Sequence, residues 1–72
     1  MKNMNKLLLN KGIYTKEVIA ETAMAFVNLA EIKYCQDDSY HILTFENCRY
    51  GVSLTKKEFE NYAVNLMVSK NG

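Results

Sequence analysis

Hydrophobic residues recur at helical spacing in the N-terminal half of the chain. The recurring residues, at intervals of four, three and four positions, are Ile19, Ala23, Phe26 and Ala30. This spacing places them on one face of a helix. Thr15 is a suitable N-cap, because its hydroxyl oxygen can accept a hydrogen bond from the first helical turn. Tyr14 and Ile19 occupy the positions of a hydrophobic staple. Together these signals predict a helix over residues 16–30.

A second helical pattern lies near the C-terminal end. Its apolar residues are Phe59, Tyr62, Ala63, Leu66 and Met67. Thr55 and Glu58 match the capping box, in which the two side chains each satisfy a free N–H group at the start of a helix. Leu54 and Phe59 stand at staple positions. We therefore expect an N-cap at Thr55 and a helix over residues 56–69.

Between the two helical patterns, the sequence predicts a β-hairpin. Residues 32–36 alternate and are rich in strand formers, residues 37–39 are Asp-Asp-Ser and favour a turn, and residues 40–45 resume a strand. The second strand lacks a clean polar face. Either a β-bulge shifts its phase near Ile42 and Leu43, or both of its faces are covered.

The remaining segments complete a β-α-β-β-α order. Residues 6–10 are apolar enough for a strand, and Asn10 and Gly12 disfavour a helix there. Residues 47–53 are compatible with a loop or with an extension of the strand before them. We expect a two-layer α+β sandwich, in which two helices pack on one face of a small antiparallel or mixed sheet. At least one strand edge then stays open.

The length of the chain allows one domain with one thin core. We expect a disordered start at residues 1–5, a single domain at residues 6–68 and a frayed tail at residues 69–72. The 72 residues carry a formal net charge of +1, and Arg49 is the only arginine, which argues against nucleic-acid binding. No apolar run approaches the ~20 residues that span a bilayer. The two cysteines fit a reducing cytoplasm, and the frequent Lys and Asn are typical of an AT-rich bacterial genome.

The sequence offers little support for catalysis or for a cofactor. Cys35, His41 and Cys48 are the only soft metal ligands, and their spacing matches no compact zinc pattern. We expect Cys35 to pack as a small apolar residue and His41 to lie on a solvated strand face. Asp37 and Asp38 are read as turn formers rather than as a cation site or an acid–base pair. A metal-dependent protein that uses the three soft ligands is kept as an alternative.

The candidate partner-binding residues are aromatic or basic and lie on or beside the hairpin: Tyr34, Tyr40, Tyr50 and Arg49. A tyrosine places an apolar ring and a polar hydroxyl together, which suits the rim of an interface. An open strand edge can also take up a peptide through main-chain hydrogen bonds. Half-buried rim residues without a partner are an equally good account of these tyrosines.

Several short runs resemble a known family. They are Tyr14-Thr15-Lys16-Glu17-Val18-Ile19, Thr22-Ala23 with Phe26, Ile32, Tyr40-His41-Ile42-Leu43, and Glu58-Phe59-Glu60-Asn61-Tyr62 with Asn65-Leu66. In this pattern the chain resembles the HxsD-like small proteins, which are encoded beside radical-SAM enzymes in His-Xaa-Ser peptide-maturation systems. The likeness covers residues 13–67. It implies an accessory protein in ribosomal peptide modification, with no catalytic residues to carry over.

These observations lead to one preferred function and one runner-up. The preferred function is a non-enzymatic adaptor that binds a precursor peptide or a radical-SAM enzyme through a sheet edge and nearby tyrosines. The runner-up is a self-assembling small domain, such as a homodimer whose sheets join edge to edge and which binds no peptide.

Overall fold

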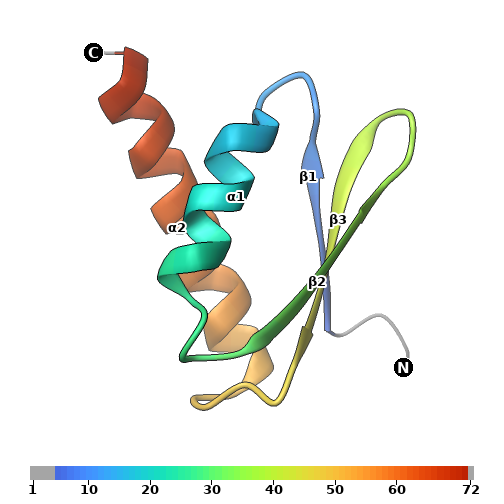
Figure 1. Cartoon of the computed structure of the whole chain (residues 1–72), viewed down its shortest axis with the longest axis vertical. Helices are drawn as coiled ribbons and strands as arrows, with labels where there is room; N and C mark the ends of the chain where they lie inside the picture. The colour runs from blue at the N-terminus through green and yellow to red at the C-terminus, as the bar shows by residue number, and fades with distance from the viewer. Residues whose placement is uncertain (1–4, 72) are drawn as a thin grey trace.

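The structure is a computed structural model that describes residues 5–71 of the chain. Its elements follow the order β1 (Lys6–Asn10), α1 (Lys16–Ala25), β2 (Glu31–Gln36), β3 (Tyr40–Glu46) and α2 (Val52–Asn71). Both helices lie on the same side of the sheet (Figure 1). The predicted two-layer α+β fold is therefore confirmed, including the order of its elements.

The sheet has the strand order β1-β3-β2, so β3 is its central strand. Both neighbours run antiparallel to β3. The register of each pair continues without interruption, and Ile42 lies opposite Leu8 on one side and Cys35 on the other. The bulge considered near Ile42 and Leu43 is therefore absent.

The two faces of β3 have different environments. His41, Leu43 and Phe45 are buried on the face that the helices cover. On the opposite face Tyr40 is 39% exposed, and Leu8 of the neighbouring β1 is 52% exposed. The expectation that both faces are covered is therefore also wrong. The second face is apolar in part, and no helix of residues 5–71 covers it, because both helices lie on the other side of the sheet (Figure 1).

Three phenylalanines join the helices to the sheet. The rings of Phe45 and Phe59 meet edge to face with centroids 5.4 Å apart, and Phe26 lies 5.3 Å from Phe59. Phe59 has no exposed surface, and Phe45 has 1%. Aromatic pairs in this geometry add to the free energy gained from burying their area. This cluster holds α1, α2 and β3 together.

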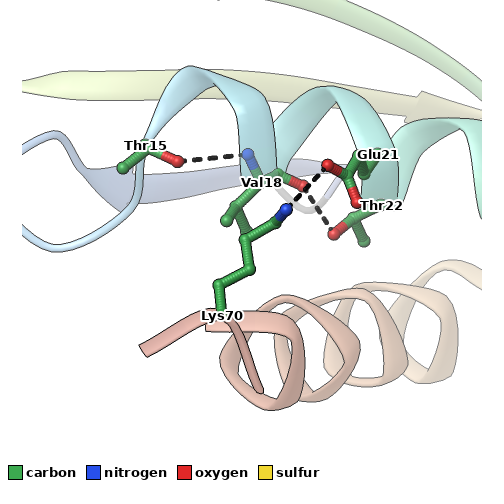
Figure 2. A network of polar contacts seen from close by, with 5 residues as sticks. All are labelled: Thr15, Val18, Glu21, Thr22 and Lys70. Atoms are coloured by element: carbon green, nitrogen blue, oxygen red, sulfur yellow. Dashed lines mark hydrogen bonds and ion pairs between the residues drawn. The ribbon is translucent and has the colours of Figure 1, made fainter. Parts of the chain in front are cut away.

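Helix α1 begins as predicted and ends earlier than predicted. Thr15 is the N-cap, and its Oγ1 accepts a hydrogen bond from the Val18 N–H at 3.2 Å (Figure 2). The helix begins at Lys16 as expected, but it ends at Ala25 and not at Ala30. Residues 26–29 form turns, because the chain must reverse within a few residues to enter β2 and because the β-branched Val27 is a poor helix former.

Helix α2 begins four residues earlier than predicted, at Val52. The predicted N-cap at Thr55 is wrong. The Thr55 hydroxyl donates to the Gly51 carbonyl at 2.7 Å and does not accept a hydrogen bond from the main-chain N–H of Glu58. Gly51 has a φ of 94°, a backbone conformation that glycine adopts without strain, and it ends the loop that follows β3. The predicted staple is not formed either, since Leu54 is 51% exposed.

The C-terminal turns of α2 are tied to α1. Lys70 Nζ lies 3.1 Å from Glu21 Oε2, and Figure 2 shows this ion pair beside the Thr15 cap. Of the tail expected to fray at residues 69–72, residues 69–71 belong to the helix and residue 72 lies outside the described part. Of the disordered start expected at residues 1–5, residues 1–4 lie outside the described part, and the Asn5 carbonyl accepts from the Phe45 N–H at 2.8 Å. Neither helix in the described chain is both long enough and apolar enough to cross a membrane.

The aromatic cluster gives a direct test of this core. Phe59→Ala should lower the free energy of unfolding by about 3–5 kcal/mol, because a large buried side chain is lost and a cavity is left. Since small domains have only ~5 kcal/mol in total, we expect the variant to be largely unfolded at 25 °C by circular dichroism. The exposed Leu54→Ala on the same helix is the control and should stay within about 0.5 kcal/mol of wild type in urea denaturation. A folded Phe59→Ala with a normal melting temperature would contradict this core.

Candidate functional site

The outer edge of β2 carries main-chain groups without partners. The Asp37 N–H donates to the Tyr40 carbonyl at 3.0 Å. Because residues of an antiparallel strand alternate between bonding to their neighbour and pointing away from it, Cys35, Lys33 and Glu31 also bond to β3. The intervening residues therefore direct their N–H and C=O groups away from the sheet: Ile32, Tyr34 and Gln36. Within residues 5–71 no group bonds to these outward donors and acceptors.

The opposite edge of the sheet, on β1, is more occupied. By the same alternation, Lys6, Leu8 and Asn10 direct their main-chain groups outward. The Lys6 carbonyl accepts from Lys56 Nζ at 3.2 Å. The Asn10 carbonyl accepts from two N–H groups of the following turn at 3.0 and 2.9 Å. The edge of β2 is therefore the better candidate for binding a partner.

An apolar groove follows the edge of β2 on the helical side of the sheet. Its first part is a hollow of about 220 Å³ between α1 and β2, lined by Lys16, Ile19, Ala20, Ala23, Ile32 and Tyr34. A second hollow of about 390 Å³ shares Ala23 and Ile32 with the first and extends it toward Val27 and Ala30. Small alanine side chains on α1 leave this space between the two elements.

Tyr34 is held in the groove by a buried histidine. Its hydroxyl lies 2.8 Å from His41 Nδ1, and His41 Nε2 lies 2.9 Å from the Tyr14 carbonyl oxygen. Because a carbonyl can only accept, Nε2 carries the proton in the neutral ring, and Nδ1 accepts from the Tyr34 hydroxyl. His41 is 3% exposed, so the expectation that it lies on a solvated face is wrong. Tyr14 joins this network through its main-chain carbonyl. Burial, followed by the charge of Glu60, raises the pKa of its side-chain hydroxyl.

A single cation stands over this arrangement. Lys16 Nζ lies 6.0 Å from the centroid of the Tyr34 ring, a distance at which an ammonium group interacts with an aromatic face. Lys16 also lines the first hollow, where the other lining side chains are uncharged. The first hollow therefore carries a single positive charge beside Tyr34, whereas the second hollow is lined by one acidic and one basic residue, Glu31 and Lys33.

The structure does not bring the four predicted binding residues together. Tyr34 faces the groove, whereas Tyr40 lies on the bare face of the sheet. Arg49 and Tyr50 belong to the loop between β3 and α2, where the Arg49 N–H donates to the Leu29 carbonyl at 2.8 Å. Only Tyr34 is part of the candidate site.

Sequence reasoning missed the groove residues of α1. Lys16 was read only as part of a family pattern, Ala23 was read as part of that pattern and of the apolar stripe, and Ala20 was not considered as a binding residue. Alanines on a helix are a signal of space next to that helix, but they show no groove until the neighbouring strand is placed.

The three soft ligands are not clustered. Cys35 is exposed on the bare face of the sheet, so the expectation that it packs as a core residue is wrong. His41 lies on the opposite face with both ring nitrogens bonded, and Cys48 packs against the core as a free thiol. Among the residues that the structure describes, no group of three His, Cys, Asp or Glu side chains is placed to hold a metal ion.

No protein-family model, curated protein or solved structure matches this chain. The resemblance to HxsD-like proteins therefore stays a prediction, and the candidate site depends on its geometry alone.

The histidine network can be tested at Tyr34. Tyr34→Phe removes the hydroxyl and leaves His41 Nδ1 without a donor, so we expect the free energy of unfolding to fall by about 1 kcal/mol. Tyr40→Phe is the matched control, because the described residues offer its hydroxyl no hydrogen bond, and it should change stability by less than about 0.5 kcal/mol. Urea denaturation measures both, and ¹⁵N chemical shifts of His41 should report a proton on Nε2. Equal losses in the two variants would contradict the network.

The hairpin turn makes a pH-dependent prediction. Asp37 Oδ1 accepts from the N–H groups of Ser39 and Tyr40 at 2.8 and 2.7 Å, and these bonds hold the pKa of Asp37 below its ordinary value of 3.8. Because the pKa of Asp37 is lower in the folded state than in the unfolded state, its ionised carboxylate stabilises the fold at any pH above the unfolded-state pKa. This contribution to stability is lost as the pH falls through the folded-state pKa. Asp37→Asn should therefore melt below wild type at pH 7, and the gap should narrow in acid. Asp38→Asn, whose side chain caps nothing in the described chain, should follow wild type at every pH.

Proposed function

We propose that this chain is a non-enzymatic adaptor that holds an extended peptide on the outer edge of β2 as a fourth strand. The observation that carries the proposal is the row of unpaired main-chain groups at Ile32, Tyr34 and Gln36, which runs directly beside an apolar groove. Peptides added to a sheet edge gain affinity from main-chain hydrogen bonds and specificity from pockets for alternate side chains. Both parts are present on this edge.

The dimensions of the two layers support a fourth strand. Two helices, each about 10 Å across with its side chains, form a layer roughly 20 Å wide. Three strands spaced about 4.8 Å apart cover only about 14 Å. By these ideal dimensions the helical layer is wider than the sheet by about one strand, and the first hollow lies between α1 and the edge strand β2.

The chemistry of the groove supports binding rather than catalysis. Its first hollow is lined by aliphatic side chains, one tyrosine and one lysine, with no acid, thiol or imidazole exposed in it. His41 is buried below, and its two ring nitrogens are already bonded. The resemblance in sequence suggests the kind of peptide: a ribosomal precursor, presented to a radical-SAM enzyme that performs the reaction.

Proline substitution tests the edge selectively. Gln36→Pro removes an outward N–H group without removing a bond to β3. The variant should still fold, because proline is tolerated on an edge strand where its nitrogen faces away from the sheet. We expect it to weaken binding of a labelled precursor peptide, measured by fluorescence anisotropy, by at least about fivefold, the equivalent of one lost hydrogen bond. Gln36→Ala keeps the N–H group and should bind like wild type.

A second proline variant locates the edge. Leu8→Pro blocks an outward N–H group on β1 and should leave binding unchanged. If Leu8→Pro weakens binding and Gln36→Pro does not, the peptide lies on β1 and the proposal is wrong. Light scattering at several protein concentrations tests the runner-up, because a stable dimer that Gln36→Pro dissociates would show that a second copy of the chain occupies the edge of β2.

A further inference from the structure

We infer that the peptide on β2 runs antiparallel to it and carries an acidic side chain opposite Tyr34, followed two residues later by an apolar side chain opposite Ile32. This inference rests on the proposed function and adds the selectivity of the same site. It follows from the direction of the side chains on an added strand, the charge at one end of the groove and the preferred sense of strand pairing.

The register decides which side chains enter the groove. Residues directly opposite each other in a ladder place their side chains on the same face of the sheet. Tyr34 and Ile32 face the helical side, since their partners on β3 are the buried Leu43 and Phe45. Peptide residues opposite Tyr34 and Ile32 therefore point toward α1, and the residue between them points to the bare face.

The charge of the groove selects an acid opposite Tyr34. Lys16 stands over the Tyr34 ring, and the described residues give it no ion-pair partner. A carboxylate opposite Tyr34 would reach this ammonium group at the edge of the groove.

The other end of the groove selects an apolar side chain. Opposite Ile32, the hollow is bounded by the aliphatic side chains of Ala23, Val27 and Ala30. Glu31 and Lys33 also line this hollow, but each already has a polar partner: Lys33 Nζ lies 3.5 Å from Glu46 Oε1, and Glu31 Oε1 accepts from Asn47 Nδ2 at 3.2 Å. An apolar side chain placed here loses contact with water and leaves no charge unpaired.

The sense of pairing sets the order of the two residues. Both existing pairs in the sheet are antiparallel, and antiparallel pairing is the more stable of the two per residue. An antiparallel peptide meets Tyr34 before Ile32. The acid therefore precedes the apolar residue, with one residue of any type between them.

Three synthetic peptides of strand-forming sequence test this order. The first has glutamate two residues before isoleucine, the second has the two exchanged, and the third has glutamine in place of glutamate. Fluorescence anisotropy should show the first binding about two- to fivefold more tightly than the others, the range expected of one exposed ion pair. The preference should vanish in Lys16→Ala and persist in Lys57→Ala, which removes a lysine of α2 that does not line the groove.

A charge reversal completes the test. Lys16→Glu should reverse the preference, so that a peptide with lysine in the acidic position binds best, and circular dichroism should show that the exposed first residue of α1 tolerates each change. Equal binding of all peptides, or a preference that Lys16→Ala does not alter, would overturn the acidic selectivity and leave the adaptor function standing. Binding of none of them, together with no binding of the precursor peptide, would overturn both.

Discussion

The central strand β3 is the element through which the rest of the molecule is connected. Its residues bond alternately to β1 and β2, so each neighbour depends on β3 for all its sheet hydrogen bonds. The side chains that point toward the helices include Leu43 and Phe45, which are buried, and Phe45 contacts Phe59 of α2. Because both of its edges are paired, β3 has no main-chain groups left with which a further strand could pair. Among the described strands, only the flanking strands β1 and β2 have an edge at which a further strand could pair.

The two flanking strands differ in how they are finished. Two outward carbonyls of β1 accept hydrogen bonds: that of Lys6 from a lysine of α2, and that of Asn10 from the turn that enters α1. On β2 five of the six residues are exposed, and the one aromatic side chain is fixed from below by His41. A histidine buried in a small core is costly when its ring nitrogens lack hydrogen-bond partners. Both nitrogens of His41 have such partners. Its effect is to hold Tyr34 and the cation above it at the border of the groove.

The sequence predicted what is decided locally and missed what depends on tertiary contacts. The bounds of β1 and the Thr15 cap follow from neighbouring residues and were predicted correctly. Thr55 and Glu58 also matched a local capping signal, but the helix begins earlier, at Val52, directly after Gly51. No capping motif in the sequence marks that position. His41 was placed on the wrong face, because alternation alone does not say which face of a strand the helices cover. The groove could not be predicted, since it lies between two elements whose spacing only the fold determines.

The strand order also governs the sequence of events during synthesis. The chain makes β1 first, yet its partner β3 is the last strand to be made, after α1 and β2. Since β2 and β3 pair through a short turn and β1 pairs with β3 over a much longer sequence separation, we expect the hairpin to form before β1 joins it. The edge proposed for peptide binding thus belongs to the part of the sheet whose contacts are local in sequence, whereas the opposite edge belongs to the strand that pairs over a long sequence separation.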